Sequence, residues 1–419
     1  MKFKKHPGLY ILCFFAFVLL PISTFAQKGS GQDEETFHFP PEWEPHAAVW
    51  VDFTEQKDWR TKDHDARLEI IETLHKYVPV KVLIDTDIAG AMLDSMMDEA
   101  GVARSRVTVI RHPVPNYFCR DAGPIFLTNG SELRLADFIW SCEGKPGCDS
   151  LWMARGEIGN DLAAQYDWKV ISSSNRSEGG GIESSNHALM AFKDYALDRN
   201  GNKSISEIEM EFLRIYGKQH MVWVDKSPLL EKNGHKLENY VGQGANGHID
   251  AFYRFLNDTT ILATVISEED REKHPIMAHD YKIFLENLAQ LNTYKRPDGK
   301  PYHIETVEMP DLSLYEYTWE ANYPGDYNGA YTFQPGDTVI FVPNMEYANI
   351  LITNGAVLCS SYWREGLPES EKKKDFHVQK ILMKYFPDRD IIPLKKSMQL
   401  NWHGGGIHCS TQQEPMVHK

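Results

Sequence analysis

The sequence predicts an α/β protein built from repeated units, and three observations point to that fold class. Apolar residues make up 42% of the 419 residues and charged residues 25%, which is typical of a folded protein with a sizeable core. Short apolar runs that suit strands alternate with stretches whose apolar residues follow a helical period. Short β-hairpins plus one helix recur about every 60 to 80 residues, so each unit can bury its apolar face on its neighbours.

The first unit begins with a rigid, proline-containing segment at 39–46. The apolar run 47–53 predicts a buried strand, and the apolar spacing from Leu68 to Val78 predicts a helix. The same reading continues with a strand at 80–84, a helix at 92–99 and a strand at 107–110.

Later segments repeat this alternation of strands and helices. The predicted elements are strands at 124–128 and 133–138; a strand at 185–192, a helix at 205–216 and a strand at 220–224; a strand at 249–265, a helix at 279–292 and a strand at 302–308; and strands at 337–342 and 349–359, a helix at 371–386 and a strand near 390–393. No linker rich in Gly, Ser or Pro interrupts 38–419, which predicts a single domain there.

The first residues have the pattern of a secretory signal peptide. Lys2, Lys4 and Lys5 precede an apolar run at 9–20, and small residues follow at the positions that a signal peptidase reads. We expect a signal peptide over 1–26, a disordered lead-in over 27–37 and export to the periplasm or the medium. The apolar run is too short to span a bilayer comfortably, and no later stretch reaches about 18 apolar residues, so no membrane span is expected.

Five cysteines follow the predicted cleavage site: Cys119, Cys142, Cys148, Cys359 and Cys409. An odd number leaves at least one free thiol in an oxidising compartment. Cys142 and Cys148 bracket a turn with glycines and a proline, and their pairing as a disulfide stays open at this stage. The net charge of −15 argues against nucleic acid as a partner and favours cationic substrates through steering.

Polar residues with chemical potential gather in four segments: 118–124, 177–183, 246–252 and 401–413. In the last of them a glycine triplet at 404–406 leads to Cys409. Glycines let another group approach the backbone closely, so this thiol is a candidate nucleophile. The alternative is a buried cysteine that only packs, which is common for this residue type.

The other three segments supply an imidazole and carboxylates. Asp121 stands in an Arg-Asp pair ahead of Gly-Pro, and Glu178 stands directly before three glycines. His248 and Asp250 lie two positions apart, so in a strand they would share a face. Each segment taken alone also suits a structural turn or loop.

One thiol, one histidine and three carboxylates, without the Cys and His spacing of a zinc site, favour a planar cationic substrate. A guanidinium group offers several N–H donors that two carboxylates can hold in a fork. Its positive charge beside Cys409 would also help to lower the pKa of the thiol.

Six motifs in order carry a specific resemblance over roughly 38–415: PPEWEPHAAVW, CRDAGP, EGGGIES, GHIDAF, YANILITNGAVL and GGGIHCSTQQEP. Together they resemble the agmatine deiminase family, which includes bacterial-type peptidylarginine deiminases. The resemblance implies an α/β fold of the pentein type, a five-bladed pseudo-symmetric propeller of ββαβ-type repeats around a central site. It also implies that 38–419 is a single catalytic domain, and family members are often homodimers.

Residue by residue, the resemblance implies that Cys409 is the nucleophile and His248 the general acid and base. Asp121 and Asp250 would hold the guanidinium. The expected substrate-binding residues are Glu178, Phe118, Asn349, Gly405 and Gly406. Phe118 stands where the family usually has Trp. No cofactor or metal is implied.

The implied reaction is hydrolytic deimination through a covalent thiouronium on Cys409, with agmatine converted to N-carbamoylputrescine and ammonia on the way to putrescine. The alternative is a protein-arginine deiminase that makes peptidyl-citrulline, so the partner is either a small guanidino compound or an arginyl peptide. A more distant alternative is a non-catalytic binding protein for guanidino ligands, which the retention of Cys409 and His248 disfavours. The segments 318–331 and 360–370 depart from the family pattern and are expected at the rim of the site.

Residues 198–209 resemble a calcium-binding EF-hand loop at several positions. Lys203, however, occupies the place where the sharp turn of such a loop requires Gly. We therefore expect Ser204 or Ser206 to cap the following helix instead.

Overall fold

The computed structural model describes residues 36–418 apart from 56–62, 146, 322–324 and 328–330. The predicted signal peptide at 1–26 and positions 27–35 of the predicted lead-in lie outside these residues. Residues from Thr36 onward form one compact unit. Among the described residues no helix is long and apolar enough to cross a membrane.

Five sheets in the described part of the chain share one pairing pattern, in which an antiparallel strand pair is extended by a parallel strand. The sheets, in strand order, are β22-β1-β2-β3, β4-β5-β6, β7-β8-β9, β12-β13-β14 and β19-β20-β21. Their strands are β1 His46–Phe53, β2 Val80–Ile84, β3 Val107–Arg111, β4 Ile125–Thr128, β5 Leu133–Ile139, β6 Lys169–Arg176, β7 Glu183–Ser184, β8 Ala188–Phe192, β9 His220–Val224, β12 Tyr253–Asn257, β13 Thr260–Val265, β14 His303–Glu308, β19 Leu351–Thr353, β20 Ala356–Ser360, β21 Asp390–Leu394 and β22 Thr411–Pro415.

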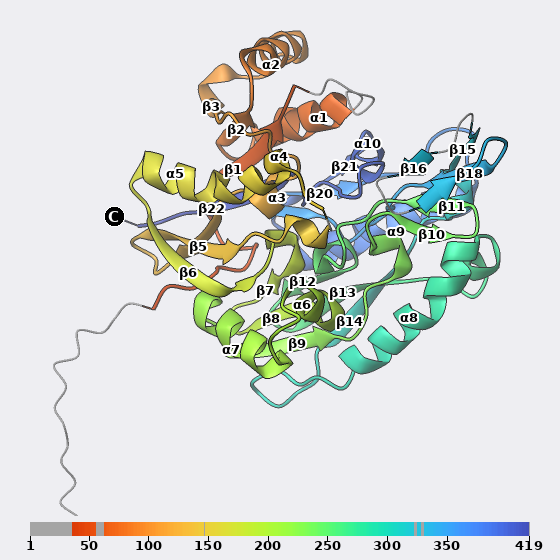
Figure 1. Ribbon diagram of the computed structural model, residues 1–419. Helices are drawn as coiled ribbons and strands as arrows, with labels where there is room; N and C mark the ends of the chain where they lie inside the picture. The colour runs from red at the N-terminus through yellow and green to blue at the C-terminus, as the bar shows by residue number, and fades with distance from the viewer. Residues whose placement is uncertain (1–35, 56–62, 146, 322–324, 328–330, 419) are drawn as a thin grey trace, which may run out of the picture. The chain divides into compact units, whose positions relative to one another are not determined.

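Each parallel pair is joined by a crossover that contains a helix, as parallel strands require. Helices α7 and α8 pack on β9, and α9 packs on β14 and β21 (Figure 1). The helices are α1 His64–Leu74, α2 Asp87–Ala100, α3 Cys119–Ala122, α4 Ser150–Ala154, α5 Ile158–Tyr166, α6 Lys193–Arg199, α7 Ile205–Tyr216, α8 Pro275–Leu291, α9 Glu369–Tyr385 and α10 Met398–Asn401.

The remaining strands form two sheets outside this pattern. They are β10 His235–Leu237, β11 Tyr240–Gly242, β18 Thr338–Val342 and β15 Tyr317–Glu320 in one sheet, and β16 Gly325–Tyr327 with β17 Tyr331–Phe333 in the other.

Strand β22 pairs antiparallel with β1, so segments from both ends of the described chain form one sheet (Figure 1). Val49 lies opposite Gln413, and Val51 lies opposite Thr411. The backbone N–H of Arg120 donates to the carbonyl of Cys409 at 3.0 Å, which ties α3 to the start of β22. This pairing fixes the position of the predicted nucleophile.

Helix α7 illustrates how local sequence sets the fold. Ser204 caps its first turn through a reciprocal pair of bonds with Glu207, and Gly217 ends it in a left-handed conformation with φ 61°. Ile208, Phe212 and Ile215 recur at helical spacing and are buried. The prediction that Ser204 caps this helix is therefore confirmed.

Three predicted single strands are wrong, because each contains a chain reversal. At 185–192 the side chain of Ser185 accepts from the N–H of Ala188 and turns the chain between β7 and β8. At 249–265 Asn257 accepts from the N–H of Thr259 between β12 and β13. At 349–359 Gly355 adopts φ 69° and permits the turn between β19 and β20. The elements at 150–176, namely α4, α5 and β6, were not predicted.

Candidate active site

A cavity of about 270 Å³ opens over Cys409 and Asp121. Its wall is built mainly from the segments 117–121, 143–152, 243–245 and 403–404, with Asn233 and Cys409. No described residue of 318–331 or 360–370 lines it, and 322–324 and 328–330 lie outside the described residues, so the expectation that these segments form the rim stays a prediction. The described part of the wall comes in large part from the loop that follows β5 and from the loop that precedes His248.

Asn349 holds the backbone and the sulfur of Cys409 together. Its Oδ1 accepts the backbone N–H of His408 at 2.8 Å and that of Cys409 at 3.2 Å. Its Nδ2 donates to Cys409 Sγ at 3.1 Å. On its other side the thiol donates toward Asp250 Oδ2 at 3.7 Å. Asn349 therefore orients the predicted nucleophile.

The two predicted glycines are needed because neighbouring groups fill the space of a side chain. A methyl carbon on Gly405 would lie 2.8 Å from the ring of Phe118 and 3.0 Å from Cβ of Cys409. On Gly406 it would lie 2.6 Å from Asn349 Oδ1 and 3.0 Å from Glu346 Oε1. Phe118 lines the cavity in a left-handed conformation with φ 59°, which is strained for a bulky residue.

A third glycine, Gly180, marks the point where three predicted catalytic side chains converge. A methyl carbon on it would lie 2.7 Å from His248 Nδ1, 2.8 Å from Asp121 Oδ1 and 3.2 Å from Asp250 Oδ1. The Gly180 N–H donates to Asp121 Oδ1 at 3.0 Å. The structure thus brings Asp121, His248 and Asp250 together, and Asp250 links them to Cys409.

His248 and Asp250 are brought together by a tight loop and not, as predicted, by a strand. The segment Ile249–Ala251 is a 3₁₀ turn, not a strand, and His248 precedes it after two left-handed residues, Asn246 and Gly247. The carboxylate of Glu231 accepts the N–H of Ala245 and that of His248, both at 3.0 Å, and so fixes this tight loop. The strand-based argument for a shared face is therefore wrong, although the two side chains do meet.

His248 lies buried between two carboxylates. Its Nδ1 is 3.4 Å from Asp121 Oδ1, and its Nε2 is 3.5 Å from Glu178 Oε2. Burial opposes a charge on the ring, but the negative charges of Asp121 and Glu178 outweigh it and raise the pKa of His248 to about 10. At neutral pH the imidazole is therefore protonated and can act as an acid.

Glu178 lies behind His248 and is not part of the cavity wall. Its carboxylate accepts from Arg199 Nε at 3.1 Å, from the Tyr195 hydroxyl at 3.0 Å and from the hydroxyl of Ser141. Burial disfavours its charge, but Arg199 and His248 hold the pKa of Glu178 well below its usual range. Like Glu178, His248 and Asp250 do not line the cavity, so the predicted contact of Glu178 with substrate stays a prediction, beside its observed contact with His248.

The pKa values of the Asp121 carboxyl group and of the Cys409 thiol are both raised. Burial raises the pKa of Asp121 to about 7, with Glu143 and Asp250 adding to the effect and His248 opposing it. Burial also raises the pKa of the Cys409 thiol well above its usual value, and the charge of Asp250 raises it further. A cation bound in the cavity would lower the pKa of both groups.

Glu346 was missed by the sequence prediction, although it stands three positions before Asn349 in the YANILITN segment. It is 1% exposed, and neither carboxyl oxygen has a hydrogen-bond partner among the described residues. A lone Glu among apolar residues was the only available signal. Buried polar groups normally have partners, so this carboxyl group requires an explanation.

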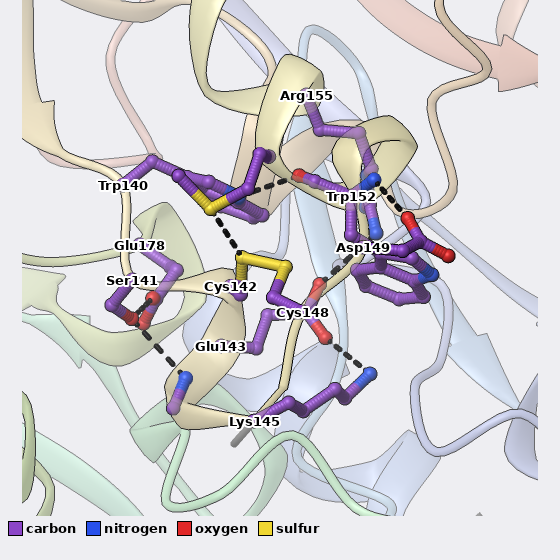
Figure 2. The surroundings of a disulfide bond; sticks show 12 residues. Trp140, Ser141, Cys142, Glu143, Lys145, Cys148, Asp149, Trp152, Arg155 and Glu178 are labelled. Atoms are coloured by element: carbon purple, nitrogen blue, oxygen red, sulfur yellow. Dashed lines mark hydrogen bonds and ion pairs between the residues drawn. A yellow bond between two sulfur atoms is a disulfide. The ribbon is translucent and has the colours of Figure 1, made fainter.

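A disulfide between Cys142 and Cys148 closes a short loop (Figure 2), and several residues of this loop line the cavity. The loop carries Glu143, whose carboxylate lies 2.8 Å from Lys145 Nζ and 3.4 Å from Arg155 Nη1. Glu143, Lys145 and Cys148 line the cavity. The disulfide between Cys142 and Cys148, which the sequence left open, therefore shapes this part of the cavity wall.

On its other side Asp250 contacts a second group of charges, the paired cluster of Glu42, Glu183, Arg254 and His408. His408 Nδ1 lies 2.6 Å from Asp250 Oδ2, and its Nε2 lies 3.1 Å from Glu42 Oε2. Arg254 pairs with Glu42 and, at 2.8 Å, with Glu183. Glu42, Glu183 and His408 lie close enough together to hold a metal ion, but Arg254 already pairs with both carboxylates.

The arrangement suits covalent chemistry on a planar cation. A buried thiol lies beside a carboxylate, and a protonated imidazole lies within the same group. Asp121 and Asp250 supply the negative charge that a positively charged carbon centre needs.

The chain is similar to known proteins over nearly its whole length. The family model of Porphyromonas-type peptidyl-arginine deiminases matches residues 38–415. The agmatine deiminase of Medicago truncatula is 23% identical over 399 residues, which cover 91% of this chain and 97% of that protein. That of Ectopseudomonas mendocina is 23% identical over 396 residues, with 90% and 95% covered.

The structure is also similar to that of the agmatine deiminase of Enterococcus faecalis. The TM-score is 0.73 at 19% sequence identity, and the match covers 93% of this chain and 98% of that one. At this identity the likeness shows that the two proteins share a mixed α/β fold.

Proposed function

Because the chain belongs to the Porphyromonas-type peptidyl-arginine deiminase family, we propose that it hydrolyses a guanidino group, with agmatine as the preferred substrate. The products would be N-carbamoylputrescine and ammonia. The names of the curated relatives support agmatine, since they are agmatine deiminases aligned over nearly their whole length.

The convergence at Gly180 is the observation that carries this proposal. Atoms of Asp121, His248 and Asp250 all lie within 3.2 Å of one point, and Cys409 Sγ is 3.7 Å from Asp250. Asp250 Oδ1 and both ring nitrogens of His248 have no hydrogen bond to the described residues. A guanidinium carries the N–H donors that Asp250 Oδ1 lacks.

In the first half of the reaction, Asp121 and Asp250 bind the guanidinium and hold its carbon over Cys409 Sγ. The cation lowers the pKa of the thiol, whose proton passes to a neighbouring carboxylate such as Asp250 or to solvent. The thiolate attacks the carbon and forms a tetrahedral centre. His248 then protonates the departing nitrogen, and ammonia leaves a thiouronium on Cys409.

In the second half, His248 has lost its proton and can take one from an entering water molecule. The hydroxide attacks the thiouronium carbon, and the carbon–sulfur bond breaks. The excess proton on the oxygen of the ureido product passes to the sulfur, the imidazole keeps the proton that it took from water, and the product leaves. The overall reaction consumes one water and releases one ammonia.

Ammonia release from agmatine, free arginine and an arginyl peptide tests the proposal. Agmatine should give the highest kcat/KM. Binding of guanidino compounds without any ammonia release would instead indicate the non-catalytic binding protein.

A protein-arginine deiminase is the second candidate. The matching family model is that of peptidyl-arginine deiminases, and a predicted signal peptide at 1–26 would bring the chain to a compartment rich in peptides. A higher kcat/KM on the arginyl peptide than on agmatine would favour it.

We also propose the finer features that the family resemblance implies. The five sheets with a common pairing pattern support a five-bladed propeller with the site at its centre. Export follows from the pattern of residues 1–26 and is tested by sequencing the N-terminus of the protein from the periplasm or the medium. A homodimer, as in many relatives, is tested by light scattering in solution.

A further inference from the structure

Glu346 is a buried acidic group that has no role in the proposed reaction. It lies beside Asn349 and Gly406, which flank Cys409 in space and in the chain. Its Oε1 is 3.0 Å from the position of a methyl carbon on Gly406, and the same position is 2.6 Å from Asn349 Oδ1. The carboxyl group therefore belongs to the surroundings of the nucleophile.

The surroundings of Glu346 provide neither a hydrogen bond nor a cation. Both oxygens lack a partner among the described residues, and the side chain is 1% exposed. The charged groups that act on it are Glu231 before the His248 loop, Asp250 and Asp121, all of them acidic. A carboxylate in this position would be unstable without a positive ligand.

We infer that Glu346 is a third acidic contact for the guanidino group and that it gives up a proton when this group binds. The inference rests on the proposed function, because it takes the guanidinium as the ligand. It adds to the reaction a third acidic binding residue, one that is neutral before the ligand binds.

The charges around Glu346 determine whether ligand binding releases or takes up a proton. In the empty site, burial raises the pKa of Glu346 well above its usual value, and its three acidic neighbours raise it further, so the group is neutral. A guanidinium close to these carboxylates stabilises the charged form and lowers that pKa. Binding therefore releases a proton to the solvent and becomes tighter as the pH rises.

Calorimetry on a Cys409→Ser variant isolates this proton. The variant cannot form the thiouronium, and it removes the thiol as a source of protons. Agmatine binding is measured in two buffers with different ionisation enthalpies, which gives the number of protons released. Adding Glu346→Gln should lower that number by about one and weaken binding at least about tenfold, because a charge-assisted contact is lost.

Other titrating groups are controlled within the same experiment. Asp121, Glu231 and His248 are present with and without the Glu346 substitution, so only the difference between variants is assigned to Glu346. Glu371→Gln is a matched control, since Glu371 is also 1% exposed but its carboxylate lies 2.8 Å from Lys374. It should leave proton release unchanged.

The outcomes separate the two proposals. If the Cys409→Ser variant does not bind agmatine, the proposed function is wrong and this inference with it. If it binds agmatine but Glu346→Gln leaves both affinity and proton release unchanged, only this inference is wrong. Infrared difference spectra of the Cys409→Ser protein test the inference without a substitution of Glu346. Agmatine should remove the carbonyl band of a protonated carboxyl group. An unchanged band would overturn the inference.

Discussion

Two groups of buried charges meet at Asp250, and they differ in how completely their atoms are paired. In the paired cluster (Glu42, Glu183, Arg254 and His408), Arg254 contacts both glutamates and His408 bridges Asp250 and Glu42. In the site cluster (Asp121, His248, Asp250 and Cys409), the ring of His248 stays 3.4 Å from Asp121 and makes no hydrogen bond to the described residues. Asp250 belongs to both, with Oδ2 facing His408 and Oδ1 facing the Gly180 point.

The difference shows that residue type alone does not distinguish structural charges from a binding site. Both clusters contain a histidine and carboxylates, and both are buried. The paired cluster lines a cavity of about 30 Å³, whereas Cys409 and Asp121 line one of about 270 Å³. Unpaired buried polar atoms are costly, so the site cluster is the one that a polar cationic ligand can stabilise.

The largest expected effect concerns Cys409, the one thiol of the site cluster. Cys409→Ser should reduce kcat by at least about 10³-fold, because a hydroxyl group is a far weaker nucleophile than a thiolate. Ammonia release measures the loss, and the thermal unfolding midpoint should stay close to that of the wild type. Equal turnover in the two proteins would exclude the covalent route.

The two histidines test the comparison directly. His248→Ala should lower kcat by about 10²- to 10⁴-fold, since it removes the acid and base. His408→Ala should instead lower the free energy of unfolding by about 3 to 5 kcal/mol, because it leaves Asp250 and Glu42 without their shared partner. Urea unfolding and steady-state kinetics on both variants provide the measurements. If His408→Ala proves as stable as the wild type, the paired cluster is not structural.

The pH dependence of kcat/KM sharpens the assignment of the site cluster. Asp121, with a pKa of about 7, must lose its proton to bind a cation, so activity should fall below about pH 7. His248, with a pKa of about 10, must keep its proton to act as an acid, so activity should fall again above about pH 10. Circular dichroism at each pH controls for unfolding. An activity maximum below pH 6 would contradict these roles.

The smallest effect is expected from the entrance loop. Replacing Cys142 and Cys148 by Ser removes a short covalent loop and should lower the free energy of unfolding by about 2 kcal/mol. KM should rise a few-fold because Glu143 and Lys145 line the entrance, while kcat should change little. A collapse of kcat in this double variant would mean that the loop also positions the site cluster.

The sequence predicted the regular elements and the chemistry better than the contacts. The strands at 80–84 and 220–224 and the helix at 205–216 match the structure residue for residue, because their apolar period and flanking signals agree. Hairpins were expected in the repeat, but the turns of three of them were not located, where a single Ser, Asn or Gly reverses the chain.

For the candidate site, the motifs identified Asp121, His248, Asp250 and Cys409, which the structure brings together. They could not reveal that Glu178 faces His248 or that Glu346 lies unpaired near Cys409. A motif records residue types, whereas a role depends on which atoms already have partners. That information appears only when distant segments are packed together.

The pairing of β22 with β1 has a consequence for biosynthesis. On the ribosome, β1 emerges among the first strands and must wait for its antiparallel neighbour until nearly all the other described strands have been made. Such a long separation in sequence makes the contact late and slow to form. Cys409, just before β22, would therefore reach its acidic neighbours only in the final stage of folding. A nascent chain whose earlier segments have already left the ribosome would still be inactive toward substrate.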